Sequence, residues 1–201
     1  SSKNDSKTRY FGTAISYELD SLNLITWRFN INETKFENRG LLNSRLAGMN
    51  DIIQGYYLKT TGRNTSAAMD AALDYQLTAK ADKNRMLTIS YRYSTNKDAL
   101  QNDADISNAV NFPDPDYIQI NQQHSSENTV QLDYAYPGKK LIIEAGIKGI
   151  FRSNKSNFQY LFFNQASGKF EQESLFSDLF NYRQTVLGAY NAYQYNLGSW
   201  D

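Results

Sequence analysis

The 201-residue sequence predicts an all-β fold, an antiparallel up-and-down meander of seven or eight strands. Apolar and polar residues alternate with a period of two through much of the chain, and no sustained helical periodicity competes with this pattern. The alternating segments come in pairs separated by short polar turns, the usual connection between consecutive antiparallel strands. Aromatic residues make up 14% of the chain, and strands favour aromatic side chains.

The first predicted hairpin spans about residues 10–32. In its first strand Ile15 and Tyr17 alternate with small or polar residues, and a polar turn follows at 20–23. The returning strand has bulky apolar residues at alternate positions: Ile25, Trp27 and Phe29. Successive side chains of a strand point to opposite faces, so Arg28 belongs to the other face.

The second predicted hairpin spans about residues 66–95, with Leu73 and Ile89 among its apolar positions. Asp74 and Arg92 belong to the polar face of its two strands. If the turn is centred on Lys83, Asp74 lies directly opposite Arg92. We then expect a cross-strand ion pair between these two side chains.

The third predicted hairpin spans about residues 128–152 and turns at Pro137 and Gly138. Its apolar positions include Leu132, Ile143 and Ile147. Its polar positions include Asp133, Glu144 and Lys148. A last strand is predicted over about 183–197, where alternation does not separate the two faces.

The connections between hairpins are predicted to be long polar loops, at about 33–65, 95–128 and 153–181. Within the third loop, a short hairpin is predicted to turn at Gly168. Tyrosines near strand ends recur every 58 or 59 residues, at Tyr17, Tyr75, Tyr134 and Tyr193. Structureless loops of this length are uncommon in compact soluble domains. Short turns at one end and long loops at the other are typical of outer-membrane β-barrels.

Two arrangements explain strands with one apolar and one polar face. In a membrane barrel, lipid would contact the apolar residues Ile25, Trp27, Phe29, Leu73, Ile89, Leu132, Ile143 and Ile147. The charged residues of the opposite face, expected to point into a water-filled lumen, are Arg28, Asp74, Arg92, Asp133, Glu144 and Lys148. The alternative is a soluble β-sandwich or small barrel that binds carbohydrate through loop aromatics.

Charges in mid-strand and tyrosines near strand ends favour the membrane barrel over the soluble alternative. A tilted strand of about 9–11 residues is enough to cross a bilayer. Bacterial single-chain barrels have an even number of strands, from 8 upwards. Seven strands are counted here, and 198–201 lie where another short turn is expected. We therefore expect the whole chain, 1–201, to be one segment of a larger barrel.

Composition and motifs exclude several other functions. The formal net charge is zero, so the basic surface of a nucleic-acid-binding protein is not expected. The chain has no cysteine and one histidine, His124, without a second histidine to share a metal. No apolar stretch is long enough for a transmembrane helix, and no targeting segment is visible at 1–10. We expect no catalytic residue, no metal and no cofactor, and thus no enzyme.

Aromatic residues in the predicted loops are the candidates for ligand binding. Their rings could stack on a sugar or an apolar ligand surface, and neighbouring amides could bind hydroxyl groups. Packing between loops would use the same side chains. The four candidates are Tyr117, Phe158, Tyr160 and Phe162.

Two segments resemble the outer membrane protein β-barrel family, which is TonB-dependent-receptor-like. The segments are NTVQLDYAYPGKKLIIEAGIKGIFRSN, at 128–154, and LFNYRQTVLGAYNAYQYNLGSWD, at 179–201. The resemblance implies a protein of the bacterial outer membrane that takes up a nutrient or another small ligand. It implies that the protein contacts outer-membrane lipid and receives energy from the TonB system through an N-terminal region. We also expect that the isolated chain could pair its sheet edges with a second copy.

Overall fold

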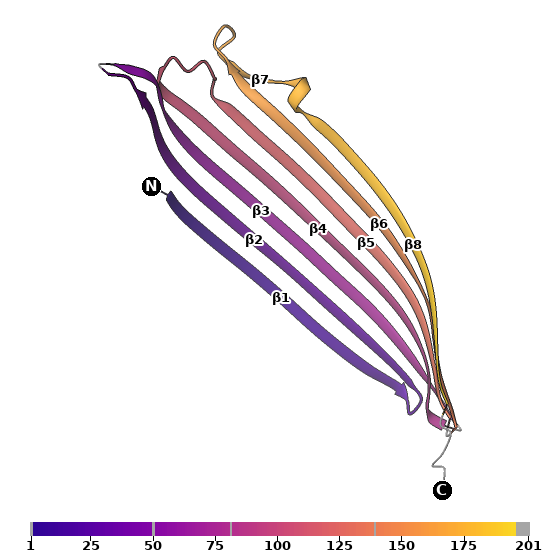
Figure 1. The fold of residues 1–201 in the computed structure, drawn as a ribbon. Coiled ribbons are helices and arrows are strands. Elements are labelled where there is room, and N and C mark those ends of the chain that lie inside the picture. Colours follow the sequence, from indigo (N-terminus) through magenta and orange to yellow (C-terminus); the bar gives the residue numbers. More distant parts are fainter. Residues whose placement is uncertain (1, 50, 81, 139, 196–201) are drawn as a thin grey trace.

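The computed structural model describes residues 2–49, 51–80, 82–138 and 140–195. They form one antiparallel sheet of eight strands, and strands next to each other in the chain are neighbours in the sheet from β1 to β7 (Figure 1). This confirms the predicted all-β meander. The strands are β1 (Ser2–Asp20), β2 (Asn23–Ala47), β3 (Ile52–Ala79), β4 (Asp82–Val110), β5 (Tyr117–Pro137), β6 (Leu141–Asn164), β7 (Lys169–Gln172) and β8 (Asp178–Tyr195).

The last two strands share one edge of β6. β7 pairs with the end of β6 that lies far from the tight turns, and β8 pairs with the remainder, from Leu141 to Phe158. The β6–β7 hairpin turns at Gly168, whose φ of 67° belongs to the left-handed region that glycine enters without strain. A short 3-10 helix, η1 (Ser174–Phe176), then leads into β8. The short hairpin predicted at Gly168 is therefore confirmed.

The prediction of three long loops is wrong for most of the residues concerned. The connections far from the tight turns are 48–51, 111–116 and 165–177, and the last of these contains β7 and η1. They are longer than the connections at the other end, so the predicted asymmetry is present. The strands nevertheless continue through most of 33–65, 95–128 and 153–164. The predicted last strand begins earlier, at Asp178, and positions 196–201, with the turn expected there, lie outside the described residues.

The physical reason for this error is the length of the strands. At about 3.3 Å per residue, the 29 residues of β4 reach roughly 95 Å, several times the thickness of a hydrocarbon layer. Where a strand extends beyond the membrane into water, neither of its faces is uniformly apolar. The period-two alternation of apolar and polar residues then disappears although the strand continues, and the sequence pattern wrongly predicts a loop.

The sheet is a single layer without a hydrophobic core. Within the described ranges, the only buried apolar residues are Ala72 and Ala104, and no second sheet covers either face. Many large apolar side chains are exposed, including Ile147 with an exposed fraction of 57%. The soluble sandwich requires a second layer that these residues do not provide. In the same ranges no helix is long and apolar enough to cross a membrane.

The sheet is open at both sides. β1 lies at one edge and β8 at the other, and in the described part of the chain these two strands do not pair (Figure 1). In hydrocarbon each unpaired backbone group costs several kcal/mol. Inside a bilayer both edges therefore need partner strands, as the predicted larger barrel would supply.

Candidate functional site

The register places all eight predicted lipid-facing residues on one face of the sheet, here called the apolar face. Residues directly opposite each other in an antiparallel ladder lie on the same face. Ile25 is opposite Tyr75, Tyr75 is opposite Ile89, and the same row continues through Leu132 to Ile147. The other members, Trp27, Phe29, Leu73 and Ile143, lie an even number of residues away along these strands.

The four regularly spaced tyrosines also lie on the apolar face, near the tight turns. Tyr17 and Tyr75 share a row, because both flank Ile25. On β5 this row passes through Leu132, and Tyr134 lies two residues nearer the tight turns. On β8, Tyr193 lies opposite Ile143, which is two residues nearer the turns again. The descent from Tyr75 through Tyr134 to Tyr193 is expected if the strands are tilted to a membrane plane and these tyrosines lie at one depth in it.

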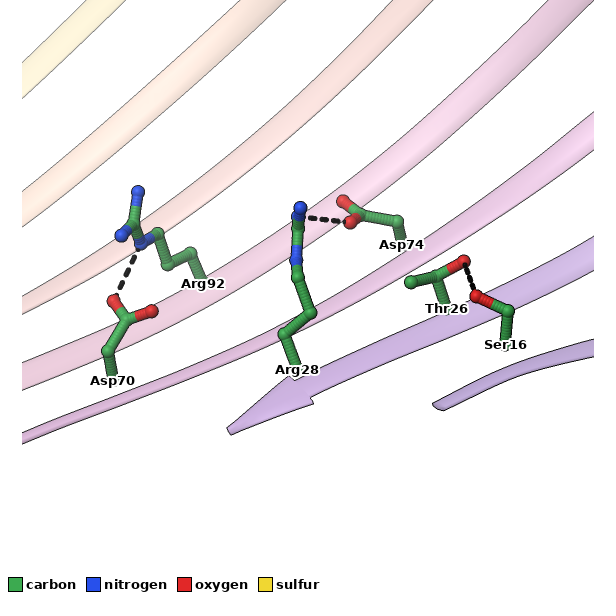
Figure 2. Close-up of polar contacts among 6 residues, drawn as sticks. All are labelled: Ser16, Thr26, Arg28, Asp70, Asp74 and Arg92. Carbon is green, nitrogen blue, oxygen red and sulfur yellow. Dashed lines mark hydrogen bonds and ion pairs between the residues drawn. The ribbon is translucent and has the colours of Figure 1, made fainter. Parts of the chain in front are cut away.

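The six predicted lumen residues lie together on the opposite face, here called the polar face. Arg28, Asp74 and Arg92 belong to β2, β3 and β4, and the remaining three, Asp133, Glu144 and Lys148, to β5 and β6. Ion pairs and hydrogen bonds cross from strand to strand on this face. Arg28 Nη2 donates to Asp74 Oδ2 at 2.5 Å, and Arg92 Nε donates to Asp70 Oδ2 at 2.7 Å (Figure 2).

The predicted pairing of Asp74 with Arg92 is wrong by one step. Asp74 lies opposite Ser90 and Arg92 opposite Ala72, because the strands pair about a centre one residue before Lys83. Moving the centre by one residue shifts each partner by two, so the face is unchanged while the neighbour differs. Asp74 therefore binds Arg28 from the other neighbouring strand, and Arg92 binds Asp70.

A second polar cluster crosses β5, β6 and β8. Arg152 Nε donates to Glu127 Oε2 at 2.5 Å, and the Tyr190 hydroxyl donates to Asp133 Oδ1 at 2.7 Å. Gln131 also donates to both oxygens of Asp133. Glu144 and Lys148 form no ion pair within the described ranges.

Two hollows lie on the polar face among these groups. One of about 460 Å³ is lined by Asn30, Asp70, Asn96 and Arg152, among others. The second, of about 390 Å³, is lined mainly by Arg28, Asp74, Arg92, Gln131 and Lys148. The buried residues Ala72, Ala104 and Thr129 all belong to the polar face. Crowding of this kind is expected on the inner side of a curved sheet.

The four predicted ligand-binding aromatics lie on the polar face, in the half of the sheet far from the tight turns. Tyr117 is opposite Phe162, and Phe158 and Tyr160 occupy alternate positions of the same strand, β6. The Tyr117 and Tyr160 rings stack with centroids 5.4 Å apart, and Phe176 of η1 contacts Tyr160 edge-on at 5.7 Å. Partial burial is the main cause that raises the pKa of the Tyr160 hydroxyl, which therefore stays neutral and able to donate.

Several residues of the polar face are absent from the sequence-based set of lumen residues. Asp70 follows the same alternation as Asp74, and the sequence already places its charge on the polar face of that strand. Glu127 lies within the predicted loop 95–128, and the alternation in 183–197 did not show to which face Tyr190 belongs. Two further exposed aromatics, Phe180 and Tyr182 of β8, lie on the polar face near Phe158.

The sequence also singled out a histidine. His124 lies between Lys97 and Lys155 and beside no second metal ligand, and in the described residues no group of three potential ligands is arranged for a metal. Lys97, His124 and Lys155 form a row across three strands. This row lies on the same side of the sheet as the apolar face, but farther from the tight turns than the apolar residues.

The Arg28–Asp74 ion pair gives a test of the register. Asp74 is 18% exposed and Arg28 53%, so water screens their attraction in part. A double-mutant cycle with Arg28→Ala and Asp74→Ala is expected to give a coupling energy of about 0.5–1 kcal/mol, measured by urea unfolding of the protein in lipid vesicles. The same cycle with Arg92→Ala and Asp74→Ala is expected to give coupling near zero. Larger coupling in the second cycle would contradict the register.

A curved sheet with one apolar face, one charged and hydrogen-bonded face, and tyrosines near its turn end defines the wall of an outer-membrane β-barrel. The sequence model of the outer membrane protein beta-barrel family matches residues 77–201, more than half of the chain. The chain belongs to this family, and the protein is located in the bacterial outer membrane. A comparison with curated proteins found no match.

Proposed function

We propose that this chain forms part of the barrel wall of a TonB-dependent-receptor-like protein, which takes up a small ligand across the outer membrane. In this proposal the apolar face contacts lipid and the polar face lines an aqueous lumen. The observation that carries it is the separation of the two faces: one is predominantly apolar across the predicted membrane band, and the other carries ion pairs on five neighbouring strands, β2 to β6.

The polar face requires water rather than hydrocarbon. Arg92 and Arg28 remain more than half exposed although each forms an ion pair. A lipid-facing arginine at the middle of a bilayer costs about 2–4 kcal/mol, whereas in a lumen it stays hydrated. The hollows of about 460 and 390 Å³ on this face add space lined by groups that donate and accept hydrogen bonds.

Ligand capture is assigned to the half of the polar face far from the tight turns. Tyr117, Phe158, Tyr160 and Phe162 lie there on strands that extend beyond the apolar band. Their rings offer stacking surfaces, and the neutral Tyr160 hydroxyl can donate a hydrogen bond to a ligand. We propose binding and passage without covalent chemistry, so the protein is a transporter and not an enzyme. Siderophore, oligosaccharide, peptide and cobalamin are the candidate ligand classes.

The energy source in the proposal is the TonB system, acting through an N-terminal region of the protein. Support for this element comes from the family resemblance alone. It makes uptake dependent on the proton motive force, whereas diffusion through an open pore is independent of it.

The test measures uptake in cells that produce the full-length protein and in cells that lack it. One labelled representative of each ligand class is supplied, with and without a protonophore. We expect one representative to accumulate only in producing cells and only without the protonophore. Accumulation that the protonophore does not change would indicate a passive pore. No protein-dependent accumulation of any representative would contradict the proposed uptake of these ligands.

A further inference from the structure

A row of basic side chains lies on the same side of the sheet as the apolar face, beyond the apolar band. Lys97 of β4 is directly opposite His124 of β5, and His124 is directly opposite Lys155 of β6. Arg183 of β8 lies one two-residue step closer to the band, opposite Ser153. We call Lys97, His124, Lys155 and Arg183 the basic row.

The basic row brings four basic side chains together on β4, β5, β6 and β8. Over β1 to β4, some cations on this side are paired with carboxylates, Arg9 and Lys35 with Glu33, Arg39 with Glu37, and Arg63 with Asp103, whereas Lys3, Lys7, Arg45 and Lys59 form no ion pair with any described residue. The members of the basic row form no ion pair in the described structure. Between the row and the band on β4, β5, β6 and β8, every residue of this face is uncharged.

A hollow of about 440 Å³ lies at the basic row. Lys97, His124 and Lys155 line it together with Asp98, several uncharged polar residues and the apolar side chains of Ala67, Ala99 and Leu179. The Nδ1 atom of His124 is enclosed and has no hydrogen-bond partner. The hollow therefore combines basic side chains that form no ion pair in the described chain with a surface that accepts an uncharged, partly apolar group.

A second hollow, of about 500 Å³, lies nearer the tight turns on β5, β6 and β8. It is lined mainly by Val130, Leu132, Ile147 and Leu187, and the absence of a side chain at Gly149 leaves room among them. Gly149 is six residues from Lys155 along β6, roughly 20 Å at 3.3 Å per residue. A headgroup at the basic row would place its acyl chains along this apolar hollow.

We propose that the basic row and the two hollows form a binding site for one anionic lipid of the outer leaflet, a phosphorylated glycolipid. The cations bind the phosphate and an acyl chain occupies the hollow at Gly149. Charge complementarity and continuity with the apolar band support a lipid as the occupant. The inference rests on the proposed orientation, in which the apolar face contacts lipid.

The test measures binding of lipid A with two phosphates to the full-length protein in detergent, by native mass spectrometry. The site variant replaces Lys97, Lys155 and Arg183 with Gln. The control variant replaces Arg9, Lys35 and Arg39 with Gln, which removes the same charge from the same side of the sheet. Each basic side chain near an anionic lipid surface contributes about fivefold to the affinity. We therefore expect the site variant to bind lipid A at least tenfold more weakly than the unchanged protein. The control variant is expected to bind within twofold of the unchanged protein.

A Gly149→Leu variant tests the acyl part of the site. A Cβ at this position meets Leu187 and Phe151 at ordinary contact distance, so the substitution is tolerated while its larger side chain fills the hollow. We expect it to weaken lipid binding severalfold without changing the charge. Unfolding of all variants in urea verifies that the barrel is intact.

Four results would overturn the site. They are unchanged binding in the site variant, equal losses in the site and control variants, equal binding of lipid A without phosphates, and full competition by inorganic phosphate. If this site fails while the proposed orientation is right, replacing Ile147 with Arg still destabilises the barrel. Failure of the proposed orientation abolishes that destabilisation, so the two failures are distinguishable.

Discussion

Replacing Ile147 with Arg is expected to destabilise the folded barrel by about 2–4 kcal/mol. Ile147 is 57% exposed on the apolar face, between the tyrosine level near the turns and Phe151 at the far side of the band. In the proposed orientation its side chain lies near the middle of the hydrocarbon layer. The measurement is the free energy of unfolding of the full-length protein in phospholipid vesicles, from urea titration.

Two control variants test depth and face separately. Ile143→Arg lies at the tyrosine level, opposite Tyr193, and is expected to cost about 0–1 kcal/mol. Ser90→Arg lies on the polar face opposite Asp74 and is expected to cost less than about 1 kcal/mol, because the new cation meets water and a carboxylate. Equal costs at Ile147 and Ser90 would contradict the assignment of the faces.

Replacing Gly146 with Leu is expected to destabilise the barrel by about 1–3 kcal/mol. The ring of Tyr190 crosses over Gly146 to donate its hydroxyl proton to Asp133, and a Cβ at this position would meet both the ring and the carboxylate. The leucine must displace Tyr190 and break the hydrogen bond. Asp133 would then lose the partner from β8.

The matched control for this prediction is Gly188→Leu. Gly188 lies on the polar face of β8, opposite Lys148 and two residues from Tyr190, and a Cβ there meets no atom within 4 Å. We expect a change of less than about 0.5 kcal/mol in the same urea titration. A similar loss at both glycines would show that the Tyr190 contact is not the cause.

The sequence predicted which face each residue occupies, because that assignment depends only on parity. Ile25, Leu73 and Ile147 belong to three strands, and all were assigned to the face on which they lie. Parity is reliable where one face meets an apolar environment and the other is polar. In 33–47 and 96–110 neither face is uniformly apolar, and there the strands were predicted as loops.

Neighbours across the sheet were predicted less well than faces. The partner of Asp74 depends on the centre of a turn, and an error of one residue at Lys83 exchanged Arg28 for Arg92. The contacts of Tyr190 and Glu127 depend on strands whose alternation is weak. The site aromatics Tyr117 and Tyr160 were identified by type, but their shared face with Arg28 became evident only from the register of β5 and β6.

The most direct test of the central claim is the accessibility of alternate positions, and residues 1–201 contain no cysteine. Single cysteines are placed at Ile89, Leu132 and Ile147 on the apolar face and at Ser90, Gln131 and Lys148 on the polar face, in full-length protein in vesicles. A fluorophore on each is quenched by a lipid-soluble or a water-soluble agent. We predict that the lipid-soluble agent quenches the first three and the water-soluble agent the last three. The same quenching on both faces, or the reverse pattern, would contradict a barrel wall with lipid on one side and water on the other.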